Sequence, residues 1–282
     1  MTIKDILLHL DSAEATQSAK DFAASLAEQT GAHLTAGGVV IDYPPPASEL
    51  ASFAPDWSFG NIEVLSKLAE MRRQAIETAY ESFSAAVPAG VSSELVVIQS
   101  FQEQACDDFA RLARHFDFTV ISQGDPEAGM DSRMLLSSAL FRSGRPVFVV
   151  PAAHRGPAKI DHAMVCWDGG MQAAKALAES LPLLARARKV EVVCVTGASE
   201  SRKALPGFDI TRHLARHRID ATLRELPTSH DAGSALIAYA RESAADVLVM
   251  GGYGHWRLSE LILGGATRSL LAAPPTPLFM AH

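Results

Sequence analysis

The chain has 282 residues, of which 48% are hydrophobic and 20% charged, with a formal net charge of −7. This composition excludes a disordered, collagen-like or coiled-coil protein. The acidic balance, without a run of Lys and Arg, argues against a general nucleic-acid binder. The length predicts two domains or one large α/β domain.

The first residues carry no recognisable targeting signal. The run from Met1 to Ser12 lacks a basic region followed by a cleavage site of small residues. No uncharged apolar run approaches the roughly 20 residues needed to span a bilayer. The three cysteines, Cys106, Cys166 and Cys194, are far apart and form no CxxC pair. We therefore expect reduced, buried thiols in a cytoplasmic protein without membrane contact.

Strands and helices are expected to alternate along the first half of the chain. Short apolar runs are typical of strands in a parallel sheet that is covered on both faces. These strands are expected near residues 5–11, 33–41, 93–99, 118–123 and 146–150. A longer insertion, Asp42 to Asn61, carries three consecutive prolines.

The second half is expected to follow the same plan. Its strands are expected near residues 162–168, 190–196, 221–226, 246–251 and 277–281, and its helices near 171–186, 208–217, 232–243 and 259–272. Each half opens with an apolar run that closes on an aspartate, Asp11 or Asp168. The chain thus contains two copies of one α/β unit, residues 1–153 and 158–282, joined by a Gly/Pro-containing linker.

Alternating strands and helices imply right-handed crossovers and a doubly wound sheet. The fold class is therefore α/β, with two tandem, mainly parallel five-stranded sheets flanked by helices. The final strands, Val147–Val150 and Leu278–Met280, are uncharged. Because an exposed apolar strand invites pairing, we expect both at the contact between the units, as an intramolecular pseudo-dimer. A further homodimer is the less direct expectation.

Three segments of the second copy should meet where the strand order reverses, at the carboxyl ends of the strands. They are Asp168, the strand end at Val195 and Thr196, and the glycine-rich segment that begins at Met250. Glycines let a backbone approach phosphates, and exposed amides at a helix start donate to an anion. The alternative is that these glycines only end a strand and turn a loop.

The spacing of Gly251, Gly254 and Gly264 resembles the nucleotide-binding signature of the universal stress protein family. The resemblance includes the aspartate after the first strand and covers both halves, as in a tandem member of the family. It implies a fold similar to the adenine nucleotide alpha hydrolases. It also implies binding of ATP or a related adenine nucleotide, with Mg²⁺ as an optional companion, and pairing of the two domains.

The resemblance implies a role for each residue of the site. Asp168 and Val195 would face adenine and ribose, and the segment after the fourth strand would line the ribose and the phosphates. The residues concerned are Asp168, Val195, Met250, Gly251, Tyr253, Gly254, Gly264, Gly265, Ala266 and Thr267. In the family a Ser or Thr normally follows the third glycine, whereas this chain has Gly265. One hydroxyl donor is thereby lost, and Thr267 is the expected substitute.

The first copy lacks this signature. Residues 123–131 contain three carboxylates at the matching place, and the expected matching turn at Ser137-Ser138-Ala139 has no glycine. Asp11 is expected to be a helix N-cap or loop residue. Residues 1–156 carry 20 acids and 11 bases, a net charge of −9, and residues 157–282 carry 12 acids and 14 bases, a net charge of +2. An anionic ligand should therefore prefer the second copy.

The sequence offers no catalytic residues. It has no Walker A sequence, no GxSxG elbow and no acidic metal cluster, so ATP hydrolysis should be weak at most. His213 and His217 have the spacing of a metal pair, but three neighbouring arginines disfavour a cation, and no metal is expected. The main hypothesis is a cytoplasmic stress-response protein with one adenine nucleotide in the second domain. The alternative is a structural or interaction protein that acts through dimerisation and partner binding.

Overall fold

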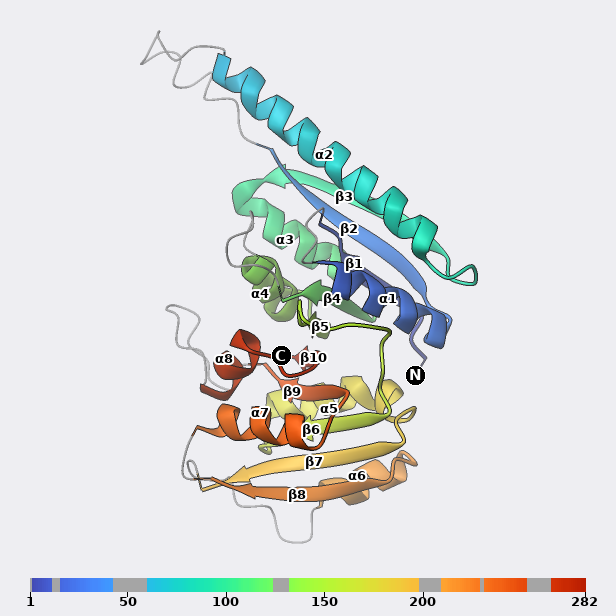
Figure 1. Ribbon diagram of the computed structural model, residues 1–282. Coiled ribbons are helices and arrows are strands. Elements are labelled where there is room, and N and C mark those ends of the chain that lie inside the picture. The colour runs from blue at the N-terminus through green and yellow to red at the C-terminus, as the bar shows by residue number, and fades with distance from the viewer. Residues whose placement is uncertain are drawn as a thin grey trace.

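The computed structural model describes residues 2–11, 16–42, 60–123, 132–197, 209–228, 231–252 and 265–282. Within these ranges ten strands form one sheet in the order β3-β2-β1-β4-β5-β10-β9-β6-β7-β8 (Figure 1). The strands are β1 (Asp5–His9), β2 (His33–Asp42), β3 (Ser93–Phe101), β4 (Phe118–Ser122), β5 (Val147–Val150), β6 (His162–Cys166), β7 (Lys189–Thr196), β8 (Ala221–Pro227), β9 (Val247–Gly251) and β10 (Leu278–Ala281).

Helices cover both faces of this sheet. They are α1 (Gln17–Thr30), α2 (Gly60–Ala86), α3 (Gln102–Ala113), α4 (Ser132–Arg142), α5 (Met171–Leu184), α6 (Ile210–Arg216), α7 (Ala232–Glu242) and α8 (Gly265–Ala272). The apolar side chains of α1, α5 and α6 pack in one core cluster. Those of α3, α4, α7 and α8 pack in another. This arrangement confirms the predicted doubly wound α/β class.

The two halves of the chain join edge to edge. We call β1–β5 with α1–α4 the N-terminal unit, and β6–β10 with α5–α8 the C-terminal unit; Figure 1 shows them above and below the centre. Within each unit all neighbouring strands are parallel, whereas β5 and β10 pair antiparallel between the units. The two expected five-stranded sheets are therefore one continuous sheet, because each edge strand satisfies the backbone groups of the other.

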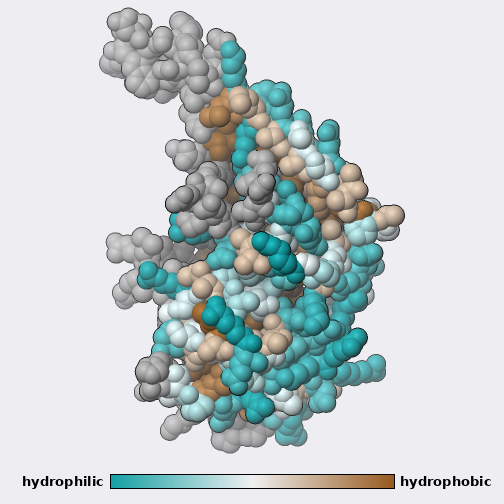
Figure 2. Space-filling view, in the orientation of Figure 1, coloured by the Kyte–Doolittle hydropathy of each residue, from teal (hydrophilic) through white to brown (hydrophobic). Residues whose placement is uncertain are grey.

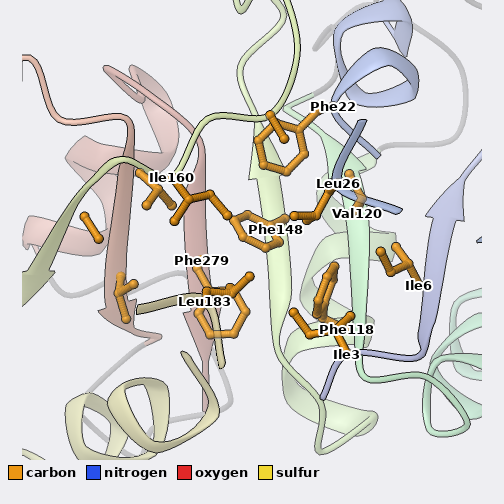
Figure 3. Packing of buried hydrophobic residues seen from close by; sticks show 14 of the residues in the cluster. Ile3, Ile6, Phe22, Leu26, Phe118, Val120, Phe148, Ile160, Leu183 and Phe279 are labelled. Carbon is orange, nitrogen blue, oxygen red and sulfur yellow. The ribbon is translucent and has the colours of Figure 1, made fainter. Parts of the chain in front are cut away.

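Phe148 and Phe279 lie directly opposite each other in this antiparallel pair, with ring centroids 5.0 Å apart. Phe22 of α1 and Phe118 of β4 complete the aromatic group, at 5.1 and 5.3 Å from Phe148 (Figure 3). The same cluster continues to Leu183 of α5. The two units thus share one hydrophobic core across their junction.

Local sequence explains where several helices begin and end. Gly31 ends α1 in the left-handed conformation, with φ 67°, and its N–H donates to the carbonyl of Ala27. Asp231 precedes α7, and its carboxylate accepts a hydrogen bond from the backbone N–H of Ser234.

The bounds expected for the insertion, Asp42 to Asn61, need correction at both ends. The 27 residues of α2 begin at Gly60, so the end of the predicted insertion is helical, and Asp42 still belongs to β2. The three prolines lie outside the described residues. On α2, Leu68 and Met71 are 49% and 65% exposed. Figure 2 shows hydrophobic and hydrophilic surface interspersed along this helix. Over the described ranges, no helix has both the length and the apolar character needed to cross a lipid bilayer.

His9 at the end of β1 makes the stability of the fold depend on pH. The ring is 5% exposed and stands edge-on to Phe109, with centroids 5.5 Å apart. Burial lowers the pKa of His9 to about 4; Asp11 opposes this shift and Arg72 adds to it. The folded protein therefore keeps His9 neutral at pH values where the unfolded chain binds a proton.

The destabilisation by His9 is absent above about pH 6.5, the ordinary pKa of histidine, and grows as the pH falls towards 4, because protons bind to the unfolded chain before they bind to the folded protein. We expect the free energy of unfolding to drop by up to about 3 kcal/mol over this range because of His9 alone. His9→Gln should remove most of that slope in urea denaturation measured from pH 7 to 4.5. The same substitution at exposed His115 is the control. An unchanged slope in His9→Gln would contradict the assignment.

Candidate functional site

The sheet of the C-terminal unit reverses its strand order between β6 and β9. These strands are parallel neighbours, with Ala163 opposite Val247 and Val165 opposite Val249. From them the chain continues to opposite sides, to β7 beyond β6 and to β10 beyond β9. Their carboxyl ends therefore flank the crevice in which doubly wound sheets bind ligands. Asp168 and Gly251 lie at these two ends.

Asp168 presents an exposed carboxylate at the start of α5. One oxygen, Oδ1, accepts a hydrogen bond from the backbone N–H of Gly170 at 2.7 Å. Gly170 is the N-cap of α5, so Asp168 satisfies one of the free amides at this helix start. The residue remains exposed, which leaves acceptor capacity on the carboxylate for a ligand hydroxyl or amine.

Gly251 has a packing role that is independent of any ligand. A Cβ at this position would lie 2.6 Å from the backbone nitrogen of Ala173 and 2.6 Å from the carbonyl carbon of Gln172. The first turn of α5 therefore rests directly on the end of β9. This close approach places a helix start at the crevice, and only glycine permits it.

The start of α8 is the expected phosphate cradle, and a carboxylate from α7 occupies its flank. Asp231 Oδ1 lies 3.1 Å from the position that a Cβ of Gly265 would take. Its Oδ2 accepts hydrogen bonds from the Ser234 N–H at 2.9 Å and the Ser269 hydroxyl at 3.2 Å. These hydrogen bonds, led by that from the Ser234 N–H, lower the pKa of Asp231, which stays ionised at neutral pH.

Gly233 lets the two helix starts touch. A Cβ there would lie 2.7 Å from the Ser269 Cβ and 2.9 Å from the Ala266 Cα. Asp231 is thus fixed beside α8 by packing as well as by hydrogen bonds. The expected cradle carries a built-in negative charge next to Gly265.

The other expected site residues divide into covered and undescribed positions. Met250 and Thr267 are only 5% and 7% exposed, and Val195 packs against the core. So little of Thr267 is exposed that it is a poor substitute for the missing hydroxyl at 265. Tyr253, Gly254 and Gly264 lie outside the described residues.

Two cysteines near Asp168, Cys166 of β6 and Cys194 of β7, are half-buried, whereas all three thiols were expected to be buried; only Cys106 is. Burial raises the pKa of Cys166 to about 12, with smaller effects from Asp168 and Cys194. Burial also raises the pKa of Cys194, with contributions from Glu225 and Asp168. Both thiols are protonated at neutral pH, and neither is a reactive nucleophile or a metal ligand in this state.

In the corresponding crevice of the N-terminal unit, an arginine side chain of the protein itself pairs with the aspartate. Arg72 of α2 reaches Asp11, with 2.9 Å between Nη2 and Oδ1. Asp11 is thus an ion-paired residue of the loop after β1, one of the two roles expected for it; the other role, helix N-cap, belongs to Thr16, which precedes α1. The acidic residues at 125, 127 and 131 lie outside the described residues.

The expected match at Ser137-Ser138-Ala139 is also wrong, because these residues lie inside α4. Leu278 and Val147 are the first residues of the two final strands. Gly265 precedes Leu278 by the same number of residues as Met134 precedes Val147, so Met134 is the equivalent of Gly265 in the first copy. The first copy therefore has a bulky, 58% exposed side chain where the second copy has a glycine.

Two other clusters do not make a binding site. In the groove between α3 and α4, Arg142 pairs with Asp107, Arg111 with Asp108, and Arg114 donates to the Arg142 carbonyl. The rings of His213 and His217 stand edge-on to each other, with centroids 4.8 Å apart. Over the described part of the chain, no group of three or more His, Cys, Asp or Glu residues is arranged to hold a metal ion.

Sequence reasoning missed three residues that shape these sites: Arg72, Asp231 and Gly252. Only Asp231 had a local signal, since Asp followed three residues later by Ser is a helix-capping pattern. Arg72 meets Asp11 from a distant helix, and Leu140, the side chain that faces Gly252, comes from the other unit. Neither contact is encoded in a local motif.

Searches of protein-family models and of curated proteins gave no match. Solved structures do match along the whole chain. A universal stress protein from Archaeoglobus fulgidus DSM 4304 has a TM-score of 0.66 at 17% identity, covering 98% of this chain and 97% of that one. A putative universal stress protein from Pseudomonas aeruginosa UCBPP-PA14 has a TM-score of 0.53 at 14% identity, covering 99% and 93%.

The cytoplasmic domain of a prokaryotic cation chloride cotransporter is also similar, with a TM-score of 0.51 at 12% identity, covering 99% and 95% of the two chains. These likenesses agree with the repeated strand order and with the resemblance drawn from the glycine spacing. The chain therefore has the fold of a tandem universal stress protein, with two α/β units in one polypeptide.

Proposed function

We propose that the chain is a cytoplasmic stress-response protein that binds one adenine nucleotide in the C-terminal unit. The two units would act as domains of residues 1–153 and 158–282, paired within the chain. The observation that carries the proposal is the difference between the two crevices. Asp168 is exposed beside a helix start, whereas Asp11 is ion-paired with Arg72.

The distribution of charge along the sequence also favours a site in the C-terminal unit. The C-terminal half is nearly neutral and the N-terminal half carries a net charge of −9. An anionic ligand therefore meets less repulsion at the second crevice. There the Asp168 carboxylate would accept hydrogen bonds from ribose or base, and the amides at the starts of α5 and α8 would face the phosphates.

Mass spectrometry of small molecules released from the purified, denatured protein tests this function. Release of an adenine nucleotide is the expected result. Asp168→Ala should weaken binding of added nucleotide about tenfold, the effect of one good hydrogen bond. Absence of released nucleotide, together with no thermal shift in millimolar ATP, would refute nucleotide binding.

That negative result would favour the second candidate, a protein that acts through its contacts with partners. The shared core of the two units and the similarity to a cytoplasmic domain of a transporter favour this candidate. In that case, denatured preparations would release no nucleotide, and loss of function would follow from surface substitutions rather than from Asp168→Ala.

Asp231 leads us to expect little gain from a hydroxyl at position 265. The φ of Gly265 lies outside the left-handed region, so the backbone accepts a side chain. The Cβ of a serine there would lie 3.1 Å from Asp231 Oδ1, a carboxylate oxygen able to accept from the hydroxyl. We expect Gly265→Ser to change ATP affinity by less than about threefold, and Asp231→Asn to raise it several-fold in Mg²⁺-free buffer, by removing a like charge. Titration calorimetry measures both; a tenfold gain from Gly265→Ser alone would contradict this geometry.

A further inference from the structure

The end of α4 in the N-terminal unit contacts the C-terminal unit at the residue that follows β9. A Cβ on Gly252 would lie 2.9 Å from Cδ2 of Leu140. The N–H of Gly252 donates to the Ala281 carbonyl at 2.8 Å. Gly252 therefore lies between α4 of the N-terminal unit and β10 of the C-terminal unit, and a side chain there would require Leu140 to shift.

His282 adds a second connection to the same residue. Its Nδ1 lies 2.8 Å from the Gly252 carbonyl oxygen, so this ring nitrogen donates the hydrogen bond. The imidazole stands edge-on to Phe141 of α4, with centroids 4.7 Å apart. Both backbone polar groups of Gly252 are thus bonded, and the histidine that holds one of them is braced by the N-terminal unit.

The junction is not symmetric. Thr119 and Leu248 hold equivalent places, because they pair with the first residues of β5 and β10. Gln123 is therefore the equivalent of Gly252 in the N-terminal unit. By the same alignment of the two units, Leu271 is the equivalent of Leu140. In the N-terminal unit, Gln123 Nε2 simply donates to the carbonyls of Leu271 and Ala272. The glycine and the braced histidine occur only in the unit with the candidate site.

We propose that Leu140, Phe141 and His282 are positioning residues, through which the N-terminal unit fixes the end of β9 for ligand binding in the C-terminal unit. The inference rests on the proposed nucleotide site. Gly251 is held by α5 on one side, and its neighbour Gly252 is held by α4 and His282 on the other. The N-terminal unit, whose own crevice is occupied by Arg72, thereby serves the crevice of its partner.

The test removes the brace without touching the crevice. In Phe141→Ala we expect nucleotide affinity to fall at least fivefold in titration calorimetry, because the end of β9 is less well ordered before binding. Phe141→Tyr keeps the ring and should restore affinity to within twofold. Leu271→Ala, at the pseudo-equivalent place on the other side of the junction, should leave affinity within twofold even where its melting temperature falls equally.

Hydrogen exchange supplies a readout that needs no ligand. The Gly252 amide should exchange at least tenfold faster in Phe141→Ala and at an unchanged rate in Leu271→Ala. Unchanged exchange and affinity in Phe141→Ala would overturn the positioning role. Absence of binding to the unmodified protein would refute the nucleotide site itself and its dependence on α4. In that case the exchange rates would still decide whether α4 orders the end of β9.

Discussion

Gly251→Ala should lower the free energy of unfolding by about 3 kcal/mol and abolish nucleotide binding. The added methyl group would meet backbone atoms of Gln172 and Ala173 at 2.6 Å, and backbone cannot move aside as a flexible side chain can. Overpacking of this kind typically costs about 1–3 kcal/mol, and the rigid contact places this site at the upper end. The start of α5 would have to shift away from the crevice. Urea denaturation and titration calorimetry measure the two effects.

Gly90→Ala is the matched control for this prediction. Gly90 is exposed, its φ lies outside the left-handed region, and no atom lies within 4 Å of its would-be Cβ. This variant should stay within about 0.5 kcal/mol of the unmodified protein. Equal stabilities for Gly251→Ala and Gly90→Ala would show that α5 does not rest on the end of β9.

Glu191→Ala should destabilise the C-terminal unit by about 3–5 kcal/mol, the usual effect of removing one partner from a buried ionic group. Glu191 is 2% exposed and lies on β7, the strand next to the edge strand β8. Its carboxylate lies 2.6 Å from His162 Nε2, 2.9 Å from Lys189 Nζ and 3.1 Å from the Tyr239 hydroxyl. The substitution leaves these donors without their acceptor. Thermal or urea unfolding gives the loss directly.

The pH dependence of this effect follows from the same contacts. Burial by itself would raise the pKa of Glu191, but hydrogen bonds from Lys189, His162 and Tyr239 outweigh it and hold the pKa below its ordinary value. The stabilisation is therefore present above about pH 4.3, the ordinary pKa of glutamate, and is lost as the pH falls through the lowered value.

Arg224 provides the control for Glu191. Its Nε lies 3.8 Å from the same carboxylate, but its side chain is 61% exposed. Arg224→Gln should therefore cost less than about 1 kcal/mol. A loss as large as that of Glu191→Ala would mean that the surface arginine, and not the buried donors, carries the network.

The fold was predictable from sequence because its signals are local and repeated. Apolar runs of strand length that alternate with alanine-rich helical patterns occur twice in the same order, and every strand begins and ends within two residues of its expected bounds. The apolar final strands were expected at the contact between the units, and Val147–Val150 does pair with Leu278–Ala281. That the two sheets would join into one continuous ten-stranded sheet could not be predicted, because no local pattern encodes the register between these two strands.

The candidate site was only partly predictable. The strand-end positions of Asp168 and Gly251 follow from periodicity, but the reason for Gly251 is the backbone of α5, which only the packed structure reveals. Arg72 and Asp11 are 61 positions apart, and Asp231 reaches α8 from the start of another helix. Charges brought together by tertiary packing decide what each crevice can bind, and sequence spacing does not show them.

The stoichiometry and location of bound nucleotide test the central claim most directly. Titration calorimetry with ATP on the unmodified chain, Asp168→Ala and Asp11→Ala separates the two crevices. The account predicts one nucleotide per chain, binding about tenfold weaker in Asp168→Ala and within twofold of normal in Asp11→Ala. Two nucleotides per chain, or an affinity that is unchanged in Asp168→Ala and lost in Asp11→Ala, would contradict it.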